Sequence, residues 1–118
     1  MIIYLKNKQT LKIGDFFFKC SIGKNGLSKK KIEGDKKTPI GTFELQNLYF
    51  RKDKIKNPIT DLKSIKIHKT MGWSDDIKFP KKYNSLIKVN NKIHHEKLHR
   101  KDYKYDLLIP IKYNFKKK

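Results

Sequence analysis

Apolar and polar residues alternate in short stretches along most of the chain. The first two stretches, residues 2–5 and residues 9–13, are separated by the polar segment 6–8. Successive side chains of a β-strand point to opposite faces, so a short alternating stretch predicts a strand with one buried face. Two such stretches around a polar turn predict a β-hairpin at the start of the chain.

A third alternating stretch follows at residues 16–22. One face of this predicted strand is apolar and consists of Phe16, Phe18, Cys20 and Ile22. We expect this face to contact the core. Cys20 is then a buried structural residue, because a nucleophilic cysteine needs an electropositive and partly exposed position.

The remaining pattern predicts strands rather than helices. Alternation predicts strands at residues 42–50, 65–68 and 105–113, and Pro110 places the last of them at a sheet edge or a bulge. A helical period is found only at residues 92–100, where charged side chains four positions apart predict one short helix. The sequence therefore predicts a mainly β fold with a single short helix.

Length and composition favour one globular domain that spans residues 1–118. The chain has 118 residues, 36% of them hydrophobic, with 7 Phe, 6 Tyr and 1 Trp. These large side chains are sufficient for a modest core in spite of the polar composition. Residues 1–11 interleave lysines with apolar residues. We therefore expect neither a signal peptide nor a membrane span, and on this basis a cytoplasmic chain.

The net charge of +19 is extreme for a chain of this length. Such a charge usually indicates an anionic partner, such as nucleic acid, an acidic membrane surface or a cell-wall polymer. Here the charge comes almost entirely from scattered lysines, Arg51 and Arg100 are the only arginines, and alanine is absent. This composition is typical of an AT-rich genome. The lack of an aromatic-rich basic stripe argues against specific nucleic-acid binding.

A turn-rich segment at residues 34–43 has the sequence Gly-Asp-Lys-Lys-Thr-Pro-Ile-Gly-Thr-Phe. Its glycines allow a positive φ, and Pro39 biases Thr38 towards an extended conformation. A loop, a tight turn and a strand are predicted. On residue types alone, an ordinary β-turn between two strands explains the segment about equally well.

Two polar clusters contain residue types that carry chemistry in other proteins. Residues 72–76, Gly-Trp-Ser-Asp-Asp, hold two adjacent carboxylates, for which backbone capping is favoured over metal binding because consecutive side chains rarely meet one ligand. Residues 94–102 contain three histidines, with His95 and His99 four positions apart. A zinc site needs a further ligand, and none is evident. We therefore expect no metal and no cofactor.

In order and spacing, these clusters together resemble the L,D-transpeptidase catalytic domain (YkuD-type), in particular its short bacterial members with a Gly-Trp-Cys-Asp-Asp segment. The resemblance rests on residues 20–23, 34–43, 72–76, 83–84, 95–102, 105–107 and 113–114 and covers almost the whole chain. It implies a sandwich-like domain of the cell envelope or periplasm. In that family a histidine-activated cysteine thiolate attacks the peptide stem of peptidoglycan, and an amine or water resolves the thioester acyl-enzyme.

The resemblance also assigns roles to individual residues. The framework motif consists of Gly34, Asp35, Thr38, Pro39, Gly41 and Phe43. The candidates for contacts in the substrate groove are Trp73, His95, Glu96 and Arg100. A purely structural role is the alternative for each of these residues.

The family's catalytic pattern, a histidine followed by Ser/Thr-x-Gly-Cys, is not found in the sequence. Cys20 does not match the catalytic cysteine, and Ser74 stands where the short members often have another cysteine. No catalytic residue is therefore assigned. We expect the chain to be the amino-terminal part of such a domain, truncated at its C-terminus and inactive alone. Residues 105–113 would then form an exposed edge that pairs with another chain.

Two other functions stay open. A non-catalytic module would hold peptidoglycan or another anionic cell-wall polymer through its lysines. A nucleic-acid binder is the less favoured alternative. The salt dependence of binding distinguishes these two functions from binding in a shaped site, because a purely electrostatic binder releases its partner steeply as the salt concentration rises.

Overall fold

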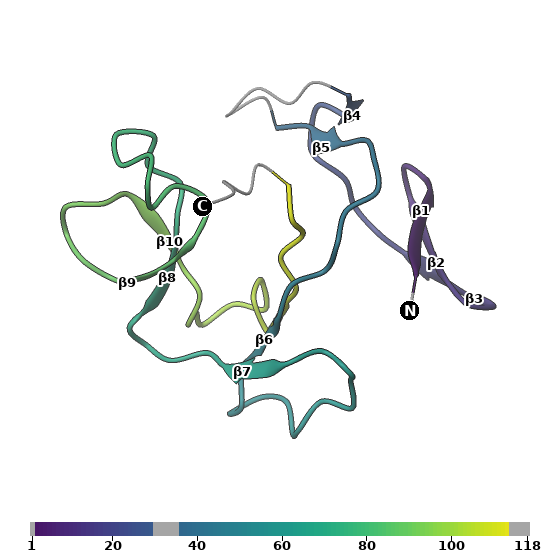
Figure 1. The fold of residues 1–118 in the computed structure, drawn as a ribbon. Helices are drawn as coiled ribbons and strands as arrows, with labels where there is room; N and C mark the ends of the chain where they lie inside the picture. The colour runs from purple at the N-terminus through teal and green to yellow at the C-terminus, as the bar shows by residue number, and fades with distance from the viewer. Residues whose placement is uncertain (1, 30–35, 114–118) are drawn as a thin grey trace. The chain divides into compact units, whose positions relative to one another are not determined.

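The computed structural model describes residues 2–29 and 36–113, which form short strands and turns without a helix (Figure 1). The prediction of a mainly β fold is confirmed. The chain divides into two compact units, Met1–Thr42 and Phe43–Lys118. Each unit is described by itself below. The described ranges contain no helix that is long and apolar enough to cross a membrane.

The first unit begins with an antiparallel sheet of three strands. They are β1 (Ile3–Asn7), β2 (Thr10–Ile13) and β3 (Phe16–Lys19), in the order β1-β2-β3. The predicted hairpin is confirmed, but its turn is at residues 8–9 because Asn7 still pairs with Thr10. The second turn contains Gly14 at φ +57°, a conformation that glycine adopts without strain.

The prediction that Phe16 and Phe18 face the core is wrong. Phe16 is 71% exposed, Phe18 is 49% exposed, and the strand ends before Cys20, which is half-buried. The opposite face is also exposed, and there the ammonium groups of Lys6 and Lys12 lie over the ring of Phe17, 4.8 and 5.9 Å from its centroid. Alternation defines the two faces of a strand, but it does not show whether another layer covers either face.

The first unit also contains a parallel pair, β4 (Leu27–Ser28) and β5 (Thr38–Pro39).

In the second unit, one sheet contains β6 (Leu48–Phe50), β7 (Ser64–Lys66) and β11 (Leu107–Leu108) in the order β11-β6-β7. The other sheet contains β8 (Met71–Ser74), β9 (Leu86–Lys88) and β10 (His95–Lys97) in the order β10-β8-β9. Tyr49, Ile67 and Leu98 form the core of the second unit, and Trp73 packs against them.

The predicted strands of the second unit exist, but they are shorter than the alternation suggested. Residues 42–50 contribute only β6 and an isolated bridge between Leu45 and Ile111. Residues 105–113 contribute β11, which is an edge strand as Pro110 predicted, and Ile111 of that bridge. Proline cannot donate to a ladder, so regular pairing stops before it.

The predicted helix at residues 92–100 is wrong, because residues 95–97 form β10 and pair antiparallel with β8. Ile93 and Leu98 are the buried residues of this segment, at 6% and 0% exposure. Five positions apart, they would lie on different sides of a helix. A helix this short has little stability of its own, so burial and pairing determine the conformation.

Candidate binding groove

An open groove of about 670 Å³ is lined by His95, Glu96, Lys97, His99, Arg100, Lys101 and Asp102. Three of the four predicted groove residues, His95, Glu96 and Arg100, are among its lining residues. Trp73 is not, but it pairs directly with Glu96 across β8 and β10. Residues that face each other in an antiparallel pair have their side chains on the same face of the sheet. The structure therefore brings the four predicted residues into one region.

Gly72 leaves room for the ring of His95. A Cβ atom at Gly72 would lie 2.9 Å from His95 Cδ2 and 3.2 Å from the carbonyl oxygen of Glu96. On its other side the imidazole is fixed by Nδ1, which is 2.7 Å from the carbonyl oxygen of Ile93. Since a carbonyl oxygen only accepts, Nδ1 is the donor, and in the neutral ring Nε2 is an acceptor.

The carboxylate of Glu96 is held by two residues that precede β11. The hydroxyl of Tyr105 donates a hydrogen bond to Oε2, and the Nζ of Lys104 lies 3.6 Å from Oε1. The same ammonium group lies 5.4 Å from the centroid of the Tyr105 ring. These contacts orient Glu96 from outside its own strand.

Arg100 and Asp102 form a two-point ion pair in the groove. Nε of Arg100 donates to Oδ1 of Asp102 at 2.9 Å, and Nη2 donates to Oδ2 at 2.6 Å. The Arg100 guanidinium, assisted by the backbone N–H of Lys104, lowers the pKa of Asp102 to about 2. The carboxylate is therefore charged at all pH values in which the protein would normally be studied.

Trp73 is fixed from the other side by a short chain of hydrogen bonds. Its indole Nε1 donates to Oδ1 of Asn84 at 3.0 Å, and Nδ2 of Asn84 donates to the carbonyl of Tyr113 at 3.1 Å. Asn84 adopts φ +54°, a left-handed conformation that asparagine tolerates better than most residues. Asn84 belongs to one of the segments that carry the family resemblance, and the structure brings it into contact with Trp73.

The two adjacent carboxylates beyond β8 have different partners. Asp76 accepts the backbone N–H groups of His94 and Lys78, both at 3.0 Å, and these bonds lower its pKa. Capping, the favoured interpretation for this pair, is thereby confirmed for Asp76. Asp75 instead pairs with the ring of His94 at 2.5 Å, a contact that the sequence did not predict. Among the described residues, no three potential metal ligands cluster.

The framework motif is only partly within the described residues, because Gly34 and Asp35 lie outside them. Thr38 and Pro39 form β5, and the hydroxyl of Thr38 accepts the backbone N–H of Gly23 at 2.6 Å. The tight turn predicted here is therefore in part a paired strand.

Two further framework residues have defined roles in the backbone and in packing. Gly41 has φ +152°, which favours glycine. The ring of Phe43 packs edge-to-face on Tyr113, with 5.2 Å between the ring centroids. Phe43 belongs to the second unit, whereas Gly41 belongs to the first.

Arg51 is the main residue near the groove that sequence reasoning missed. It is 4% exposed, and its guanidinium donates to the carbonyl oxygen of Arg100. Its rarity was a usable sign, since Arg51 and Arg100 are the only arginines among 30 basic residues. The chain uses lysine at its other basic positions and arginine at these two contacting ones.

The family model described as L,D-transpeptidase catalytic domain (YkuD) matches residues 1–112. No curated protein and no solved structure matches the chain.

Proposed function

Because the chain belongs to the family of L,D-transpeptidase catalytic domains (YkuD), which is associated with the cell wall, we propose that its groove binds the peptide stem of peptidoglycan. The observation that carries the proposal is that His95, Glu96 and Arg100 line one open groove. These residues are twenty or more positions from Trp73 in the sequence, yet β8 and β10 place Trp73 opposite Glu96. The proposed site of action is the cell envelope.

The groove has charges of both signs, which suits a peptide with free carboxylate and amino groups. Lys97, Arg100 and Lys101 supply cations, while Glu96 and Asp102 supply anions. Pairing of a ligand carboxylate with a guanidinium is directional as well as electrostatic. A shaped ligand of mixed charge therefore fits this groove better than a simple polyanion.

We propose that these 118 residues bind the stem peptide without forming a thioester. Their one cysteine, Cys20, does not match the family's catalytic cysteine, and the family's pattern of a histidine followed by Ser/Thr-x-Gly-Cys is not found in the sequence. Intact-mass measurement after incubation with a carbapenem should show no adduct. An adduct that disappears in Cys20→Ser would overturn this part of the proposal.

The binding proposal is tested with a soluble stem peptide and the fluorescence of Trp73, the only tryptophan. Arg100→Gln should weaken binding about tenfold or more, because it removes a charged donor from the groove. Lys19→Gln removes the same charge from β3 and serves as the control. Equal affinity of the two variants, with both folded, would contradict a role for the groove.

A second function is supported by the net charge of +19. A binder of anionic cell-wall polymer would use many lysines at once and would release the polymer as salt rises, because exposed charges are screened beyond about 10 Å at 0.1 M salt. Sedimentation with purified cell wall across a salt series separates the two functions. Retention at high salt that depends on Arg100 supports the groove, whereas complete release that is indifferent to Arg100 supports the polymer.

A further inference from the structure

Arg51 lies directly after β6 and is nearly inaccessible to solvent, at 4% exposure. A buried guanidinium is costly unless its donors are paired. Nε and Nη2 donate to the two carboxylate oxygens of Asp53 at 2.9 and 2.7 Å. This two-point hydrogen bond raises the pKa of Arg51 and fixes the plane of its guanidinium.

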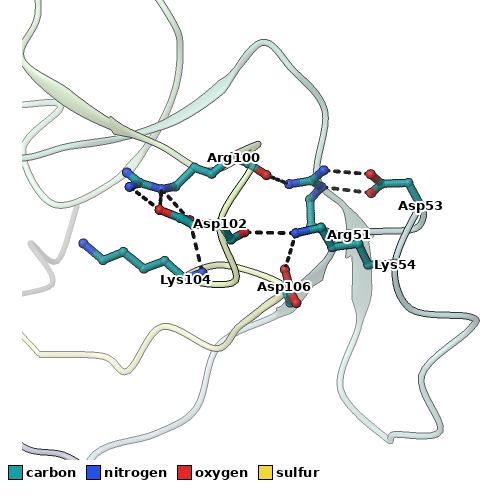
Figure 2. Close-up of polar contacts among 7 residues, drawn as sticks. All are labelled: Arg51, Asp53, Lys54, Arg100, Asp102, Lys104 and Asp106. Atoms are coloured by element: carbon teal, nitrogen blue, oxygen red, sulfur yellow. Dashed lines mark hydrogen bonds and ion pairs between the residues drawn. The ribbon is translucent and has the colours of Figure 1, made fainter.

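With its plane fixed, Arg51 directs Nη1 at the carbonyl oxygen of Arg100, to which it donates (Figure 2). The backbone N–H of Arg51 also donates to the carbonyl oxygen of Asp106 at 3.0 Å. One residue outside the groove thus contacts both ends of the segment 100–106.

Lys54 adds a second cation to the same segment. Its Nζ donates to the carbonyl oxygen of Asp102 at 2.9 Å and to the carboxylate of Asp106 at 3.1 Å. Figure 2 shows Arg51 and Lys54 on one side of the segment, with the Arg100–Asp102 pair on the other. The backbone of residues 100–102, which supports that pair, is therefore held at the carbonyl groups of Arg100 and Asp102.

The Arg100–Asp102 pair needs such support because it is largely exposed, with side-chain exposures of 35% and 51%. Exposed ion pairs contribute little to their own ordering. A binding residue is effective when surrounding contacts fix its conformation before the ligand arrives. Arg51 provides that fixation from a buried position.

We propose that Arg51 is a positioning residue for the groove, which holds the backbone of residues 100–102 so that the Arg100 guanidinium is preorganised for a ligand carboxylate. The proposal rests on the proposed function. The role requires arginine, because the ammonium group of a lysine has no planar fork with which to grip Asp53 at two points while donating to Arg100. Arg51→Lys retains the charge and removes this geometry.

The first test measures stem-peptide affinity by Trp73 fluorescence in Arg51→Lys and in a control, Lys52→Arg, which makes the reverse exchange at the adjacent exposed position. Arg51→Lys should weaken binding about tenfold, and Lys52→Arg should not change it.

A double-mutant cycle with Arg100→Gln separates positioning from general stability. If Arg51 acts through Arg100, Arg51→Lys adds little to the loss caused by Arg100→Gln. Fully additive losses would overturn the proposal.

Amide hydrogen exchange of the free protein tests the inference without any ligand. Arg51→Lys should accelerate exchange in residues 100–106 and leave β8 and β9 unchanged, and unchanged exchange in residues 100–106 would overturn it. If the wild-type chain does not bind the peptide, the proposed function fails, and the exchange data alone decide whether Arg51 fixes the segment. If Arg51→Lys does not fold, Lys54→Gln removes the contact with Asp102 and should give the same changes to a smaller extent.

Discussion

At the scale of single residues, the groove depends on close contacts that a small change would disturb. Gly72 is the clearest case, since the space that a Cβ atom would need is taken by the His95 ring and the backbone of Glu96. The ring cannot retreat freely because its Nδ1 is bonded to the carbonyl of Ile93. Glycine at this position is a packing requirement.

Gly72→Ala should therefore destabilise the protein by about 1–3 kcal/mol, the usual cost of overpacking. The free energy of unfolding, measured by urea denaturation, checks this value. Removing the ring relieves the clash, so the double variant Gly72→Ala, His95→Ala should lose less than the sum of the two single variants. Strict additivity would show that the ring is not the obstacle.

The contact between His94 and Asp75 makes stability depend on pH. The hydrogen bond and charge of Asp75 raise the pKa of His94 above its ordinary value of 6.5. A raised folded-state pKa stabilises the fold fully at pH values below the unfolded-state value, and this contribution is lost as the pH rises through the folded-state value. NMR titration of His94 should show an inflection above 6.5, and Asp75→Asn should lower it. Asp61→Asn, the same change in a different loop, should leave it in place.

At the scale of elements, the pattern of the sequence predicted which segments become strands better than it predicted their length or surroundings. The hairpin of β1 and β2 and the edge position of β11 follow from local alternation and from Pro110. The segment 92–100 does not, because its conformation is set by pairing of β10 with β8 and by burial of Leu98. Those contacts come from distant parts of the chain, and no local period reveals them.

Leu98, which directly follows β10 within the segment that carries the groove residues, is a core residue. Leu98 has 0% exposure, whereas Leu107 in β11 is 51% exposed. Leu98→Ala should cost about 2–5 kcal/mol in the free energy of unfolding, through lost burial and a cavity. The same substitution at Leu107 should stay within about 0.5 kcal/mol. Comparable losses at the two leucines, measured by chemical denaturation, would contradict the assignment of the core.

The residues of the candidate site could also be predicted only in part, because residue types are visible in the sequence and long-range contacts are not. Trp73, His95, Glu96 and Arg100 belong to segments that resemble a known family, so their types and order were visible in the sequence. Arg51 and Lys54 act through backbone carbonyls about fifty positions away. Contacts to a backbone carbonyl leave no mark on the residue type of the acceptor, so the rarity of arginine could single out Arg51 but could not show which backbone it holds.

At the scale of the whole molecule, the net charge of +19 is the dominant property. Thirty basic residues face eleven acidic ones, so the folded state carries unbalanced repulsion that salt screens. The Tm should therefore rise when sodium chloride is added to a low-salt buffer, as differential scanning calorimetry can measure. A Tm that falls would mean that the local ion pairs, such as Arg100 with Asp102, outweigh the repulsion.

The tight contact at Gly72 also has a consequence for the divergence of the family. A methyl group at this position and an imidazole at position 95 compete for the same space, so the two positions are not free to change independently. Relatives that carry a larger residue in place of Gly72 should carry a side chain smaller than histidine in place of His95. The structure thus predicts a pair of positions whose substitutions are inherited together.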